Sequence, residues 1–192
     1  KAESARQAEE MLAPVVEQVK GLLGPYVYGV DVTGLEAVCS SLLLERGLTL
    51  ATAESCTGGL IARRITALPG ASRVYRGGVV SYWTEVKAAV LGVPQDILDQ
   101  YGAVSEPTAR AMAEGARRIT GADIAVSVTG VAGPDPDERG NPVGLVFIGL
   151  ATPDGTFCRR TESGRRTRNR IQDLSANHAL DMVRRYLTGL EL

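Results

Sequence analysis

Apolar residues follow helical spacing in the first part of the chain and strand-like runs further on. Residues 5–23 carry apolar positions three and four residues apart, which predicts a helix that ends at Gly24-Pro25. A second helix is expected over residues 35–45, closed by Gly47. Between the two helices, residues 26–32 have the apolar run typical of a short strand.

From residue 48 onward, predicted strands alternate with predicted helices. Strands are expected at residues 48–53, 77–82, 123–128, 143–151 and 156–161. Helices are expected at residues 59–68, 84–91, 105–120 and 167–187. This order predicts an α/β domain over residues 34–192, a three-layer α/β/α sandwich with a mostly parallel sheet and a C-terminal antiparallel hairpin.

Composition and charge exclude several classes of protein. The 192 residues carry a formal net charge of −1, which argues against a general nucleic-acid binder, and no apolar run is long enough to cross a membrane. Cys39, Cys56 and Cys158 are odd in number and lack a CxxC pair, so neither a disulfide framework nor a metal site is expected. We expect a reducing, cytoplasmic setting. The start at Lys1, without an apolar leader, looks like a cut within a longer chain.

The distribution of histidine and lysine limits which residues can act as a catalytic base. The single histidine, His178, lies on the apolar stripe of the last predicted helix and is interpreted as a core or edge residue. Lys87 is the only lysine after residue 20, in a chain with eighteen arginines. Lysine can lose its proton when buried and arginine cannot, so Lys87 is a candidate base. A leftover surface lysine is an equally good interpretation of this residue alone.

Two glycine-rich turns follow predicted strands at what should be the same edge of the sheet. One follows residues 48–53 and carries Ser55, with Gly58 and Gly59 before a helix; the other spans residues 127–134. Ligands bind at the carboxyl ends of strands in such sheets, so both turns are expected to line one pocket. We expect free N–H groups at the helix start to hold an anion or a developing oxyanion beside the Ser55 hydroxyl. The alternative is a serine that only caps the helix.

Lys87 comes three residues after Thr84, the predicted N-cap of its helix. A helix N-terminus and burial both weaken an ammonium's hold on its proton, so a neutral Lys87 can activate Ser55. Tyr82, at the end of the preceding strand, can relay a proton or position the lysine. A half-buried strand-end aromatic is the competing interpretation.

Six arginines lie within residues 159–170. Arg166 and Arg170 are one helical turn apart, so they are expected to share a helix face with suitable spacing for a phosphate. Most of the remaining charge is interpreted as a solvated surface. A nucleic-acid contact is the alternative, and the near-neutral net charge counts against it.

Several ordered motifs resemble the CinA C-terminal domain family, the nicotinamide-nucleotide amidohydrolases, over residues 36–188. The motifs are TLATAESCTGG (49–59), GGVVSYWTEVK (77–87), GAVSE (102–106), TGVAGP (129–134), PVG (142–144) and the closing arginines. The resemblance implies hydrolysis of the carboxamide of nicotinamide mononucleotide to nicotinate mononucleotide and ammonia. It implies a nucleophilic role for Ser55, activation by Lys87 with help from Tyr82, and neither metal nor cofactor.

The resemblance also implies a binding surface. It is expected to involve Cys56, Thr57, Gly58, Gly59, Ser72, Thr129 and Gly130, with Arg166 and Arg170 at the phosphate. Residues 1–33 resemble the end of the domain that precedes this one in full-length relatives. The sequence departs from the family pattern at 83–84, 135–138 and 165, and these departures are expected to bear on loop shape and substrate affinity more than on the type of reaction.

The expected partner is a small nucleotide, with neither nucleic acid nor membrane, and the exposed N-terminal helix favours a homodimer. A non-catalytic nucleotide-binding module is the alternative function.

Overall fold

The computed structural model describes all 192 residues, which divide into two compact units, Lys1–Thr33 and Gly34–Leu192. The first unit consists of helix α1 (Ala5–Leu23) and a 3-10 turn, η1 (Gly24–Tyr26). The predicted helix is confirmed, but the strand predicted over residues 26–32 is wrong. A strand needs a neighbour for its backbone N–H and C=O groups, and this unit contains no second extended segment to supply one.

The second unit is built on one five-stranded sheet, in the order β2-β1-β3-β4-β5. The strands are β1 (Leu50–Glu54), β2 (Tyr75–Val80), β3 (Ile124–Gly130), β4 (Leu145–Thr152) and β5 (Gly155–Glu162). β1 pairs in parallel with β2 and β3, whereas β3–β4 and β4–β5 are antiparallel. Because β4 is antiparallel to both β3 and β5, β5 runs in the same direction as β1, β2 and β3. The α/β fold with its closing antiparallel hairpin is therefore confirmed, on a mixed sheet with two parallel and two antiparallel pairs.

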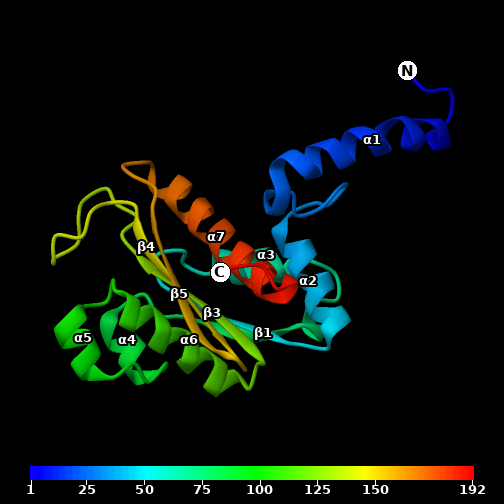
Figure 1. Cartoon of the computed structure of the whole chain (residues 1–192). Coiled ribbons are helices and arrows are strands. Elements are labelled where there is room, and N and C mark those ends of the chain that lie inside the picture. The colour runs from blue at the N-terminus through cyan, green and yellow to red at the C-terminus, as the bar shows by residue number, and fades with distance from the viewer. The chain divides into compact units, whose positions relative to one another are not determined.

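Helices cover both faces of this sheet, which confirms the three-layer sandwich (Figure 1). The helices are α2 (Leu35–Arg46), α3 (Leu60–Thr66), α4 (Thr84–Ala89), α5 (Gln95–Tyr101), α6 (Glu106–Thr120) and α7 (Arg168–Thr188), with a 3-10 turn η2 (Ala71–Arg73). One core joins α2, α3 and α7 to the sheet, and the other joins α5 and α6 to its opposite face. No helix is both long and apolar enough to span a membrane.

Small residues let α6 approach the sheet closely. A Cβ atom on Gly149 of β4 would lie 2.3 Å from the carbonyl oxygen of Ala109, and the Ser127 hydroxyl donates to that same oxygen at 2.5 Å. On β1, Ala51 and Ala53 are fully buried within the core formed with α6. β1 and β3 are hydrogen-bonded in parallel as neighbours in the sheet, so the turns that follow them emerge next to each other.

Candidate active site

The turn that carries Ser55 is held by backbone hydrogen bonds on both sides. The Ser55 N–H donates to the carbonyl of Val128 in β3 at 2.9 Å, and the Gly58 N–H donates to the Ser55 carbonyl at 3.0 Å. Gly58 and Gly59 have φ angles of 61° and 97°, which side chains with a Cβ rarely adopt. The glycines therefore allow the tight connection from β1 into α3 that places Ser55 at the sheet edge.

The start of α3 is occupied by a side chain of the protein itself. The Glu54 carboxylate, fully buried, accepts hydrogen bonds from the N–H groups of Gly59 at 3.0 Å, Ile61 at 3.1 Å and Ala62 at 2.8 Å. The expectation that these N–H groups are free for a ligand anion is therefore wrong. Glu54 ends β1 with its side chain directed under the turn, so it neutralises the positive end of α3 before any ligand arrives.

Replacing Glu54 by glutamine should lower the free energy of unfolding by about 1–3 kcal/mol, the usual effect of leaving a buried donor unpaired. A carboxamide can accept through one oxygen only, so its NH₂ group would face at least one of the N–H groups at the start of α3. Urea unfolding monitored by circular dichroism measures the change. The exposed Glu45 offers a matched control, and Glu45→Gln should stay within about 0.5 kcal/mol of the parent. Equal stability of the two variants would contradict the capping role.

Lys87 is buried beside the Ser55 hydroxyl. It belongs to α4, its side chain is 1% exposed, and its Nζ lies 3.0 Å from Ser55 Oγ. The Nζ also donates to the carbonyl of Ser81, and Lys87 takes part in none of the ion pairs. Burial lowers the pKa of Lys87 from its ordinary 10.5 to about 8. A neutral amine within hydrogen-bonding distance of a hydroxyl can accept its proton.

The helix that carries Lys87 differs in detail from the prediction. α4 begins at Thr84 itself, so Trp83 is its N-cap and no side chain caps the helix. Lys87 is consequently the fourth residue of a six-residue helix, and desolvation is the main cause of its lowered pKa.

An open cleft of about 270 Å³ brings the two glycine-rich turns together, as predicted. Its lining residues are Ser55, Cys56, Tyr82, Lys87, Ala103, Val104, the segment 129–133, Asp135, Asp137 and Arg168. The Thr129 hydroxyl donates to the Ala103 carbonyl at 2.6 Å, which ties the second turn to the segment before α6. Ser55, the Lys87 amine and both turns therefore face a single cleft.

The other residues implied by the resemblance lie outside this cleft. Thr57, Gly58 and Gly59 line a neighbouring depression together with the start of α7, and Ser72 is exposed within η2. Arg166 and Arg170 are exposed and do not line the cleft. Because α7 begins only at Arg168, Arg166 precedes the helix, and the prediction that it shares a helix face with Arg170 is wrong.

Arg168 is the cleft residue that the sequence analysis missed. Its guanidinium donates to the Gly133 carbonyl at 2.7 Å and to the Tyr82 hydroxyl. Tyr82 is 54% exposed, and its hydroxyl bonds to Arg168, whereas the Lys87 amine is bonded to Ser55 and Ser81. The sequence feature that could have indicated a role for Arg168 is its position at the start of a helix, directly after other arginines.

The Cys56 thiol, next to Ser55, is a weak nucleophile. Burial raises the pKa of the Cys56 thiol to about 12, so it stays protonated near neutral pH. The Cys56 carbonyl accepts a hydrogen bond from Gln172 of α7 at 2.8 Å, which anchors the turn. His178 is half-buried in α7 and does not line the cleft, in agreement with its interpretation as an edge residue.

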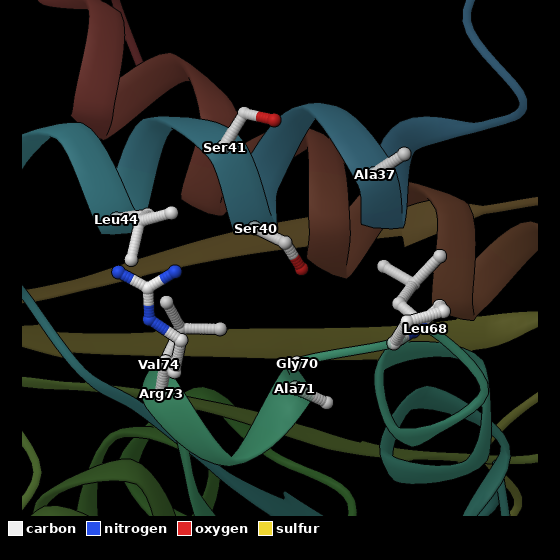
Figure 2. Close-up of a pocket in the computed structure, with 10 residues that line it drawn as sticks. Ala37, Ser40, Ser41, Leu44, Leu68, Gly70, Ala71, Arg73 and Val74 are labelled. Carbon is white, nitrogen blue, oxygen red and sulfur yellow. The ribbon is translucent and has the colours of Figure 1, made fainter.

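A second cavity, of about 260 Å³, lies between α2 and the segment 68–74 (Figure 2). Ala37 and Leu44 of α2 face Leu68, Ala71 and Val74 across it, so its walls are largely apolar. Arg73 is its only charged side chain, and no base lies beside the hydroxyl groups of Ser40 and Ser41. The cleft at Ser55 is therefore the candidate for chemistry.

Comparison with known proteins agrees with the family that the sequence motifs indicated. The family model described as the CinA C-terminal domain matches residues 32–187. The chain belongs to the CinA C-terminal domain family. A CinA superfamily protein from Klebsiella pneumoniae has a solved structure with a TM-score of 0.78 and 31% identity, covering 81% of this chain and 96% of that one. The competence/damage inducible protein CihA from Agrobacterium tumefaciens is similar, with a TM-score of 0.75 and 35% identity over 83% of this chain and 99% of that one.

Two curated relatives in the CinA family are longer than this chain. A putative competence-damage inducible protein of Caldanaerobacter subterraneus is 48% identical over 95% of the chain, which covers 44% of that protein. A CinA-like protein of Desulfovibrio desulfuricans is 47% identical over 99% of the chain, which covers 45% of that protein. The chain thus spans less than half the length of these relatives.

Proposed function

We propose that this domain is an amidohydrolase that uses Ser55 as nucleophile and neutral Lys87 as base. The observation that carries the proposal is the 3.0 Å contact between Lys87 Nζ and Ser55 Oγ, made by a buried amine whose pKa is lowered to about 8. Histidine cannot fill the role of base here, because His178 does not line the cleft. Cys56 is a poor nucleophile beside Ser55, because its thiol remains protonated.

In the proposed reaction, Lys87 takes the Ser55 proton as Ser55 Oγ attacks the carboxamide carbon. The tetrahedral intermediate collapses, the C–N bond breaks, and the leaving nitrogen receives the proton from Lys87 and departs as ammonia. Water, deprotonated by the same amine, then attacks the ester on Ser55 and releases the carboxylate product with the serine hydroxyl restored. Because Glu54 does not use the N–H group of Cys56, and Cys56 lines the cleft, this N–H is the proposed donor to the oxyanion.

The proposed substrate is the carboxamide of nicotinamide mononucleotide, which the family resemblance implies. The test is ammonia release from that compound by the purified domain, with formation of nicotinate mononucleotide followed by chromatography. Release of both products in equal amounts supports the proposal. A non-catalytic nucleotide-binding module would instead show thermal stabilisation by the mononucleotide without turnover.

The pH dependence of kcat/KM should report the titration of Lys87. The amine must be neutral to accept a proton, so activity should fall about tenfold per pH unit below a pKa near 8 and level off above it. Initial rates between pH 6 and 9.5, at substrate concentrations well below KM, measure this limb. The thiols of Cys56 and Cys158, with pKa values of about 12 and 11, titrate above this range. A flat profile across pH 7–9 would rule out Lys87 as the base.

A further inference from the structure

Charged groups are unevenly placed around the cleft. Lys87 is buried at its base and neutral when it acts, and the N–H groups at the start of α3 are taken by Glu54. Asp135 and Asp137 on the second loop add negative charge to the lining. Arg168 is thus the one permanently charged cation that lines the cleft.

Arg168 is also held in a defined orientation. One of its terminal nitrogens donates to the Gly133 carbonyl and the other to the Tyr82 hydroxyl, so a single side chain links the turn after β3 to the segment after β2. A guanidinium has five N–H donors, and these two hydrogen bonds leave three of them for a ligand. A planar, oriented fork of this kind suits the oxygens of a phosphate, which it can bind with two parallel hydrogen bonds.

We propose that Arg168, oriented by Tyr82, is the residue that selects phosphorylated amide substrates. This inference rests on the proposed function, because it takes the substrate to be an amide hydrolysed at Ser55. The phosphate would be recognised in a different part of the cleft, at Arg168. The role assigned to Tyr82 is that of a positioning residue, because its hydroxyl holds Arg168. Arg166 and Arg170, although near in sequence, are exposed outside the cleft and are not expected to contact the phosphate.

The experiment compares the kcat/KM values for nicotinamide mononucleotide and nicotinamide riboside, which differ only in the phosphate. Their ratio should fall roughly 10- to 100-fold in Arg168→Ala, the range expected for loss of a charge-assisted pair of hydrogen bonds. Tyr82→Phe should lower the ratio by a smaller factor, because the guanidinium loses one of its two anchors. The exposed Arg46 of α2, which does not line the cleft, provides the matched control, and Arg46→Ala should leave the ratio within about twofold.

A second readout separates this inference from the proposed function. Binding of nicotinate mononucleotide, measured by isothermal titration calorimetry, requires no turnover and should weaken by a similar factor in Arg168→Ala. If the parent domain binds the mononucleotide without releasing ammonia, the amidohydrolase proposal fails and the role of Arg168 is still tested. Three outcomes would overturn the inference. The ratio and the affinity could be unchanged in Arg168→Ala, the parent domain could fail to bind the mononucleotide, or selectivity could be lost in Arg170→Ala instead.

Discussion

Replacing Ser55 by alanine should lower kcat for ammonia release from nicotinamide mononucleotide by on the order of 10³-fold or more, the range seen when a catalytic nucleophile is removed. The substitution removes only the hydroxyl oxygen that lies 3.0 Å from Lys87 Nζ, the proposed base. Because the turn is held by the backbone of Ser55 and by Glu54, the cleft should keep its shape and its affinity for the mononucleotide. Steady-state kinetics and calorimetry on the same preparation measure both quantities.

Two further variants test the assignment of the nucleophile. Ser175, buried in α7, donates to a carbonyl of its own helix, so Ser175→Ala provides a serine-to-alanine change away from the cleft and should retain activity. Cys56→Ala should lose far less activity than Ser55→Ala, because its thiol is protonated. If Cys56→Ala were the more damaging of the two, the nucleophile would have to be reassigned.

Replacing Lys87 by arginine should lower kcat/KM roughly 10²- to 10⁴-fold, the usual contribution of general acid–base catalysis. Arginine keeps the positive charge but does not release its proton near neutral pH, so it can no longer accept the Ser55 proton. Lys87→Met should be impaired to a similar degree, since it removes the amine and leaves an apolar side chain of comparable length. Ammonia release near pH 8.5, where the parent amine is mostly neutral, measures both variants.

The two variants separate base catalysis from charge. If Lys87 acted only as a cation, Lys87→Arg would keep activity while Lys87→Met lost it. The exposed Lys20 in α1 offers the same exchange elsewhere, and Lys20→Arg should behave as the parent protein does. Thermal unfolding of each variant shows whether the larger guanidinium, placed in a site that is 1% exposed, has disturbed the fold.

The alternation of strands and helices was predictable because each long segment carries its own periodicity and end signals. Ser105 illustrates this, since it caps α6 as expected and accepts a hydrogen bond from the Thr108 N–H. Helix α5, seven residues between Pro94 and Gly102, was not predicted. The run at 26–32 shows the reverse error, because β propensity alone cannot supply a pairing partner.

The candidate site was predictable in its residue types but not in its contacts. Ser55 and Lys87 are 32 positions apart, and their 3.0 Å contact depends on how α4 packs beside the sheet edge. The hydrogen bonds made by Glu54 and by Arg168 depend on where α3 and α7 begin. A shift of two residues in the start of a helix changes which side chain faces the cleft. Element boundaries are the least reliable part of sequence interpretation.

The carboxylate of Glu54 has a consequence for how this domain can diversify. The Glu54 carboxylate accepts hydrogen bonds from the N–H groups at the start of α3 and offsets the positive charge of the helix end. These N–H groups therefore do not attract an anionic substrate. Under the proposals made above, bond cleavage depends on residues after β1 and in α4, and substrate choice depends on a residue at the start of α7. Exchanges around Arg168 can then redirect the domain to other amides while the serine and lysine stay in place.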